Sequence, residues 1–193
     1  MPSRSEGIQT YLHAKDENRP HLMKFVFAET AKLKITVETE TISFLPLANG
    51  VDAITQVIRD FGQVYENVYT FCLADPPKGN AGKYTCPWIV GMSEKASGSV
   101  RVGCGHYVWS FERNEPYLVD GLAITIRMME VLPPEYLHPV MGWLPGLPYP
   151  GCPACEAIKR LPDSRHSRKF ASSSIKAATE QFRLKPTNNV YRS

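Results

Sequence analysis

The sequence predicts an α+β domain in which helices near the N-terminus cover one face of an antiparallel sheet. Helix-like patterns come first, and beyond Gly62 long strand-like patterns follow one another with only short turn-forming stretches between them. Such short connections join antiparallel neighbours, and helices followed by a meander of strands are typical of this class. The chain has 193 residues, 43% of them hydrophobic and 21% charged, which fits one soluble domain with an appendage.

The first part of the chain alternates between helix and strand patterns. Apolar residues recur at helical spacing in residues 8–14 and again in 20–28, after a break at Asn18 and a restart at Pro20. Residues 32–41 alternate as a half-buried strand does. Residues 51–61 form the clearest helix pattern, with Asn49 as the expected N-cap and Gly62 just past the end.

The second part contains four strand patterns, and each is rich in β-branched and aromatic residues. They cover residues 67–73, 83–92, 97–112 and 117–132. Residues 133–144 suggest a short helical turn or two, and the proline-rich stretch 145–153 reads as an extended exit from the domain. We therefore expect a domain in residues 1–148 and an exit with a poorly ordered tail in residues 149–193.

The charges are unevenly distributed along the chain. The formal net charge is +3, yet the part from Glu156 onward has nine Lys or Arg against three acids and so carries +6. Because Ser, Ala and Asn interrupt these charges, we expect a solvated C-terminus and no specific binding of nucleic acid. The N-terminal stretch has no apolar segment that would mark a secretory signal or membrane anchor, and the cysteine number is odd. These features predict a cytoplasmic protein with free thiols and no membrane partner.

Two stretches resemble the nuclear transport factor 2-like superfamily, which includes ketosteroid isomerase and the SnoaL-type cyclases. "QTYLHAKDENRPHLMKFVFAETAKLKI" is similar to the family's opening, and "LANGVDAITQVI" is similar to its glycine-started third helix. The resemblance covers about residues 7–131. It implies a curved sheet that the helices wrap into a cone-shaped pocket, and frequent dimerisation through the outer face of the sheet.

The resemblance also implies positions for the groups that ketosteroid isomerase uses. That enzyme combines an aspartate base with an oxyanion hole of a tyrosine and a protonated aspartic acid. By resemblance, its tyrosine falls on Tyr11, its base falls at or near Ile35, and its second acid falls near Tyr107. An isoleucine cannot accept a proton, whereas a phenol can donate a hydrogen bond. The resemblance therefore leaves a pocket with polar groups but puts steroid-isomerase chemistry in doubt.

The stretch "VRVGCGHYVWSFE" is the chemically richest part of the expected sheet. Alternation places Cys104 and His106 on one face, and Gly105, Tyr107 and Trp109 on the other. We expect the second face to line the pocket, with Gly105 and Trp109 among the ligand-binding residues. His106 is the candidate base, and Asp120 on the next strand could orient it if the hairpin register pairs the two. The alternative is that all these residues serve packing.

Other candidate sites give weaker signals. A metal site from Cys72, Cys86, Cys104 and His106 is conceivable, but isolated ligands are untypical of zinc sites, so no metal is expected. The C-x-x-C pair at Cys152 lies outside any redox context. No glycine-rich nucleotide motif is present, so no cofactor is expected. Asp16 and Glu29 are read as solvated acids near helix ends.

Two functions remain open from the sequence. The first is a small-molecule-binding domain for an apolar ligand in the cone, with isomerisation, dehydration or cyclisation as possible reactions and Tyr11, Tyr107 and His106 as candidate catalytic residues. The second is a non-catalytic dimeric binding or interaction domain, in which the pocket is packed shut or recognises a partner. The missing aspartate favours the second function, and the retained polar groups on an aromatic face favour the first.

Overall fold

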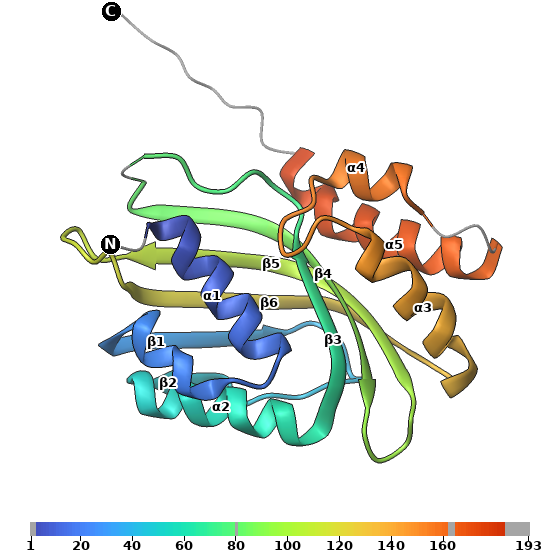
Figure 1. Cartoon of the computed structure of the whole chain (residues 1–193), viewed down its shortest axis with the longest axis horizontal. Coiled ribbons are helices and arrows are strands. Elements are labelled where there is room, and N and C mark those ends of the chain that lie inside the picture. Colours follow the sequence, from blue (N-terminus) through green and yellow to red (C-terminus); the bar gives the residue numbers. More distant parts are fainter. Residues whose placement is uncertain (1–2, 80, 162–164, 184–193) are drawn as a thin grey trace, which may run out of the picture.

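Six strands form one curved sheet that has helices on both sides (Figure 1). The computed structural model describes residues 3–79, 81–161 and 165–183. The strands are β1 (Phe27–Val37), β2 (Leu47–Asn49), β3 (Tyr65–Cys72), β4 (Lys83–Glu94), β5 (Val100–Phe111) and β6 (Val119–Leu132). The helices are α1 (Arg4–Asp16), η1 (Pro20–Phe25), α2 (Val51–Val64), η2 (Pro134–Tyr136), α3 (Leu137–Trp143), η3 (Leu144–Gly146), α4 (Ala154–Lys159) and α5 (Arg165–Arg183). The α+β class is confirmed.

The sheet is mixed rather than purely antiparallel. Its strand order is β2-β1-β6-β5-β4-β3, and the meander from β3 to β6 pairs antiparallel as expected. β1, however, pairs in parallel with β6, with Ile35 opposite Ile124. The chain between β1 and β6 includes α2 and four strands, so it is long enough for the crossover that a parallel pair needs. This long-range pairing could not be read from local alternation.

Three local differences occur near the N-terminus, and sheet pairing or turn geometry explains them. The second expected helix is only the 3₁₀ turn η1, because the amide of Val119 donates to the carbonyl of Val26 and draws the chain into β1. Asn49 is not the cap of α2, since it pairs with Lys32 in the sheet. The cap is Gly50, whose φ of 86° lies in the left-handed region that glycine tolerates. Gly62 lies inside α2, which ends at Val64.

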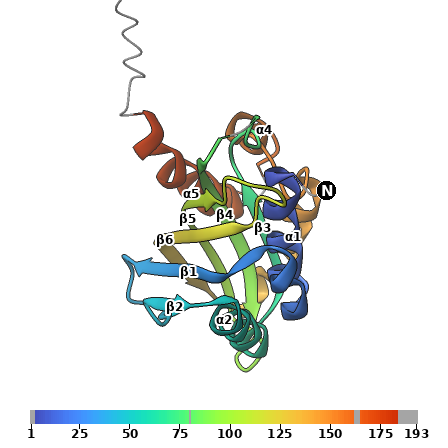
Figure 2. The same ribbon diagram turned by 90° about the vertical axis from the view of Figure 1, so that its left-hand side faces the viewer.

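Two hydrophobic clusters lie on the two faces of the sheet, and α1 and α5 lie to its two sides (Figure 2). We call the cluster between the sheet and helices α1 and α2 the inner core. Its largest buried members include Tyr11, Leu12, Met23, Phe27, Leu33, Ile54, Met92, Trp109 and Leu122. We call the cluster between the sheet and helices α3, α4 and α5 the outer core. It includes Phe71, Ile89, Val100, Val102, Cys104, Val140, Trp143, Leu144, Cys152, Ala171, Ile175 and Ala178.

The C-terminal part of the chain covers the outer face of the sheet instead of leaving it. Gly91 of β4 lets α3 and η3 approach, because a Cβ there would lie 2.2 Å from Leu144 Cδ1. The segment after η3 hydrogen-bonds to the end of β3, where the Cys72 amide donates to the Pro150 carbonyl over 2.9 Å. Residues 165–183, expected to be a poorly ordered tail, form α5, which buries Ile175 and Ala178.

Two expectations about this region stay predictions. The first is the domain boundary at residue 148. Residues 184–193 of the expected tail lie outside the described part of the chain. The dimer through the outer face of the sheet is the other. Helix α5 packs against β4, β5 and β6, so it occupies part of the face that such a dimer would use.

Candidate functional site

A cavity lies in the inner core, between the sheet and helices α1 and α2. The space open to the centre of a water-sized molecule is about 70 Å³. Its walls are mostly aliphatic and aromatic side chains from β1, α2, β4 and β6, joined by the polar groups of four residues. The polar residues are Tyr11, Lys15, Thr70 and Tyr107. A mostly apolar hollow with a few convergent polar groups is typical of small-molecule sites.

Tyr11 and Tyr107, both expected site residues, meet in this cavity. Their rings are 6.2 Å apart and nearly perpendicular. Tyr11 comes from α1 and is completely buried, whereas Tyr107 comes from β5 and stacks on Trp88 with 5.5 Å between ring centroids. Burial raises the pKa of both phenols above the usual range, and the nearby Asp16 carboxylate adds to this. Both side chains therefore stay neutral and can donate a hydrogen bond at physiological pH.

A charged cluster at the end of α1 reaches the same cavity. Lys15 lies one helical turn after Tyr11, so both side chains share one face of α1. The Lys15 Nζ donates to the hydroxyl of Thr70 over 2.7 Å and forms an ion pair with Asp16. It also lies 5.1 Å from the centre of the Phe61 ring. Lys15 is the single charged residue among the described residues that line the cavity.

Asp16 is buried, which corrects its interpretation as a solvated acid. Its side chain is 2% exposed. One carboxylate oxygen accepts hydrogen bonds from the Thr70 amide at 2.7 Å and from the Tyr149 hydroxyl at 3.0 Å. The other accepts from the Thr70 hydroxyl at 2.9 Å and contacts Lys15. With so many donors the carboxylate is held in place as the counter-ion of Lys15, and it does not line the cavity. Glu29 is exposed, as expected.

This arrangement can bind an acceptor group of a ligand. An ammonium group has three donors, and two of those of Lys15 are directed to Thr70 and Asp16, which leaves one. The Tyr11 and Tyr107 hydroxyls are further donors beside it. Trp88 also lines the cavity, and its Nε1 has no hydrogen-bond partner among the described residues. In contrast, no carboxylate or imidazole of a described residue lines the cavity, and Ile35 occupies the wall where the family resemblance places a base.

His106 does not line the cavity, which corrects its role as the candidate base. It lies on the outer face of β5, as alternation predicted, and it is half-buried. Burial lowers its pKa below 6.5; Glu38 opposes this shift, and Arg127 adds to it. The expected partnership with Asp120 is also wrong, because His106 is opposite Thr125 in the sheet. Asp120 is exposed and accepts a hydrogen bond from the Ser110 hydroxyl.

Gly105 and Trp109 lie on the inner side of β5 but do not line the cavity. A Cβ at Gly105 would lie 1.8 Å from the carbonyl oxygen of Thr125 and 2.7 Å from the Trp88 ring, so close backbone approach explains this glycine. It follows a register shift in the β5–β6 pairing. Trp109 is fully buried and packs edge-on against Tyr11, with 5.1 Å between ring centroids. Trp109 therefore packs against Tyr11 outside the cavity lining.

The cysteines are distributed over both cores. Cys72 and Cys86 lie in the inner core with their sulfur atoms 3.3 Å apart. Cys104 lies in the outer core, where burial raises its pKa to about 11. No group of three or more potential metal ligands occurs among the described residues. All five cysteines are free, with Cys152 buried and Cys155 exposed.

Lys15 and Thr70 are polar residues of the cavity lining that sequence reasoning missed. The four-residue spacing of Tyr11 and Lys15, which places both on one face of the first helix, is the signal that could have indicated Lys15. Nothing in the sequence pattern connects Thr70 to Tyr11 or Lys15, since β3 contacts α1 only in the folded chain.

No described helix is both long enough and apolar enough to cross a membrane.

Solved structures show what this fold is similar to, whereas no protein-family model and no curated protein matches the sequence. A nuclear transport factor 2-like protein from Salmonella enterica serovar Typhimurium aligns at 18% identity and a TM-score of 0.52, over 64% of this chain and 88% of its own. A hexachlorocyclohexane dehydrochlorinase aligns at 13% identity and a TM-score of 0.51, over 65% of this chain and 84% of its own. A pinacolase from Penicillium brevicompactum aligns at 11% identity and a TM-score of 0.52, over 64% of this chain and 84% of its own. The chain thus has the nuclear transport factor 2-like fold.

Proposed function

We propose that this protein binds a small, largely apolar molecule that carries a hydrogen-bond acceptor, such as a carbonyl oxygen, in the cavity of the inner core. The observation that carries the proposal is the lining of this cavity: apolar walls with the Lys15 ammonium, the Thr70 hydroxyl and two neutral phenols as its polar groups. The walls exclude water from the ligand, which strengthens a hydrogen bond from Lys15. The Asp16 counter-ion offsets the desolvation cost of burying a charged lysine at this depth.

Binding has stronger support than any particular reaction. Two solved structures of the same fold belong to enzymes that act on small molecules, a dehydrochlorinase and a pinacolase. Isomerisation, dehydration and cyclisation require a group that moves a proton, and Lys15 is occupied by its ion pair with Asp16. The donors around the cavity can polarise a bound carbonyl, which is the part of such chemistry that these residues support. A reaction would therefore depend on the substrate to supply the remaining groups.

The experiment compares two probes of nearly the same shape, cyclohexanone and methylenecyclohexane. They differ in an oxygen that only the ketone can offer to a donor, so we expect the ketone to bind about tenfold more tightly. Binding is followed by the fluorescence of Trp88, which lines the cavity, and by calorimetry. Replacing Lys15 by Met, or Tyr107 by Phe, should reduce the preference for the ketone. Native mass spectrometry of the purified protein will show whether a ligand of this kind accompanies it.

A matched control comes from the neighbouring residue of the same strand. His106→Gln changes a polar group one position from Tyr107 but on the other face of the sheet, so it should leave the preference unchanged. Equal affinity for the two probes, or no binding of either at millimolar concentration, would contradict the proposal. A preference that survives both Lys15→Met and Tyr107→Phe would remove these donors from the site.

A further inference from the structure

Residues 38–46, which connect β1 to β2, form one wall of the cavity. Ile42 is buried and Phe44 is half-buried, and both line the cavity from this segment. On its other side the same two side chains line an outer groove, in which the space open to a water-sized molecule is about 500 Å³. Val57 and Phe61 of α2 are shared between cavity and groove as well. The segment therefore separates a small inner cavity from a larger space outside it.

The backbone of this segment is attached mainly at its two ends. At one end the amide of Glu38 donates to the carbonyl of Ile126 over 2.8 Å, and at the other the amide of Ile35 donates to the carbonyl of Pro46 over 2.9 Å. Among the described residues, no backbone-to-backbone hydrogen bond holds residues 39–45. Segments with few such bonds open at low free energy while the rest of the fold stays closed.

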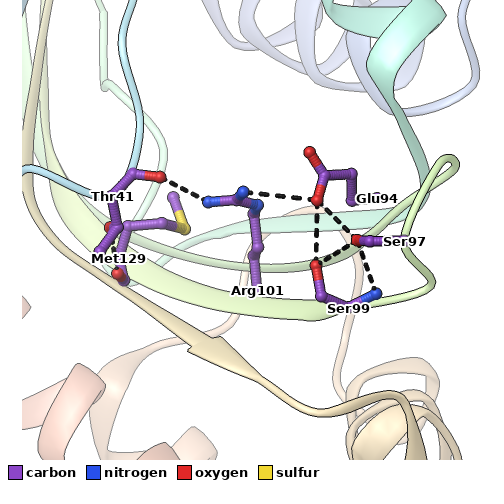
Figure 3. A network of polar contacts seen from close by, with 6 residues as sticks. All are labelled: Thr41, Glu94, Ser97, Ser99, Arg101 and Met129. Atoms are coloured by element: carbon purple, nitrogen blue, oxygen red, sulfur yellow. Dashed lines mark hydrogen bonds and ion pairs between the residues drawn. The ribbon is translucent and has the colours of Figure 1, made fainter.

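Two hydrogen bonds involving Thr41 fix the middle of the segment to the sheet (Figure 3). The Nη1 of Arg101 donates to the carbonyl of Thr41 over 2.6 Å, and the Thr41 hydroxyl donates to the carbonyl of Met129. Thr41 itself is exposed, so these bonds rather than burial hold its position. The stacked Phe44 and Phe61 rings, 6.4 Å apart, add an apolar contact nearby.

Arg101 is itself positioned by the β4–β5 hairpin. Its Nη2 lies 3.6 Å from Glu94, and the same carboxylate oxygen accepts hydrogen bonds from Ser97 at 2.7 Å and Ser99 at 3.1 Å (Figure 3). The side chain is 11% exposed and its guanidinium lies 5.5 Å from the centre of the Tyr65 ring. Its Nε has no hydrogen-bond partner among the described residues. Arg101 is thus a long, largely buried side chain with one hydrogen bond to residues 38–46. Such a side chain can hold this segment against the sheet and can release it when the bond breaks.

We propose that residues 38–46 are a lid over the cavity and that Arg101 is the positioning residue that holds this lid closed. The lid opens when the bonds of Thr41 to Arg101 and to Met129 break, which joins the cavity to the groove. Its role in admitting a ligand rests on the proposed binding function, but its opening does not. Because the cavity alone is small, a ligand larger than a few non-hydrogen atoms enters and fits by displacing Ile42 and Phe44.

The first experiment measures access to the cavity without any ligand. Trp88 lines the cavity and is 3% exposed, so we expect acrylamide, a small neutral quencher, to reach it chiefly when the lid is open. A Trp143→Phe background removes the tryptophan of the outer core and leaves Trp88 with Trp109, which is fully buried away from the cavity lining and serves as a constant background. In this background we expect Arg101→Met to raise the quenching constant several-fold, Thr41→Val to raise it less, and Arg101→Lys to give an intermediate value because lysine lacks the guanidinium fork. Arg59→Met, on the exposed side of α2, is the control and should change nothing.

The second experiment is amide hydrogen exchange, which locates the effect. Loss of the Arg101 bond should accelerate exchange in residues 39–45 by roughly tenfold and leave the strands β4 and β5 protected. Uniform acceleration over the whole chain would show that Arg101 serves global stability and would overturn the proposal. Unchanged exchange and quenching in both Arg101→Met and Thr41→Val would overturn it as well. Since neither readout uses a ligand, failure of the lid is distinguishable from failure of the proposed binding function.

Discussion

The two cores on either side of the sheet share the same strands but are filled in different ways. The outer core is a layer of apolar side chains under α3, α4 and α5, and Ser174 of α5 is a buried polar residue beside them. The inner core contains a cavity and a buried ion pair, with Tyr11 and Tyr107 beside them. Both faces of the sheet therefore bury apolar side chains, but only the inner one combines them with a cavity and buried charges among the described residues.

The physical reason for the division is the alternation of side chains along each strand. In β5, Val102 and Cys104 pack into the outer core, whereas Tyr107 and Trp109 pack into the inner core. A well-filled outer layer offsets the cost of leaving space and charge on the inner side, because stability is a sum over the whole domain. Neighbours in sequence such as His106 and Tyr107 can therefore have unrelated roles.

The largest expected effect comes from breaking the outer core. Ile175 of α5 is 1% exposed, so Ile175→Asp places an unpaired carboxylate in an apolar layer. We expect it to lower the free energy of unfolding by about 4 kcal/mol, measured by urea denaturation. Ser173→Asp adds the same charge two residues earlier at an exposed position and should change stability by less than about 0.5 kcal/mol. Equal effects of the two substitutions would show that α5 is not docked on the sheet.

An intermediate effect is expected where both cores depend on the same backbone. Gly105→Ala would bring a Cβ against the Thr125 carbonyl and the Trp88 ring, and a backbone carbonyl cannot move away without loss of sheet pairing. We expect a loss of about 3 kcal/mol and a change in Trp88 fluorescence. Gly7→Ala in α1 meets no heavy atom within 4 Å and should stabilise the protein by about 0.5–1 kcal/mol. A neutral Gly105→Ala would mean that the β5–β6 register differs from the one described.

The smallest expected effect is a pH dependence that belongs to the outer face alone. The folded protein lowers the pKa of His106 below 6.5, mainly through burial, so the unfolded chain binds a proton more readily. Stability therefore decreases as the pH falls through the unfolded value and levels off below the folded one. Melting temperatures of wild type and His106→Gln should diverge between about pH 7.5 and pH 5, with the wild type losing more. His21→Gln, on exposed η1, is the control, and identical pH profiles for all three proteins would contradict the prediction.

Much of the fold could be predicted because local patterns and long-range pairing agree in it. The meander from β3 to β6 and helix α2 follow directly from alternation and amphipathic spacing. The exceptions are places where tertiary contacts outweigh a local preference. Val26 and Ala28 have helical spacing with Leu22 and Phe25, yet pairing with β6 places Ala28 in strand β1 and leaves Val26 in the turn just before it. The charged, serine-rich residues after Arg165 resemble a solvated tail in the sequence. In the fold, however, their apolar side chains are buried against the outer face of the sheet.

The candidate site divides in the same way. The sequence by itself determined that Tyr107 and His106 lie on opposite faces, because the side-chain period of a strand is fixed by its backbone. The resemblance to the family indicated Tyr11 of the first helix, and the structure places this residue in the cavity lining. Only the tertiary structure decided that Lys15, Asp16 and Thr70 meet, since Thr70 lies more than fifty residues after the other two and approaches them only once the sheet has formed. It likewise decided that Gly105 serves a close backbone contact and that Asp120 lies away from His106, because register depends on the bulges and turns of the assembled sheet.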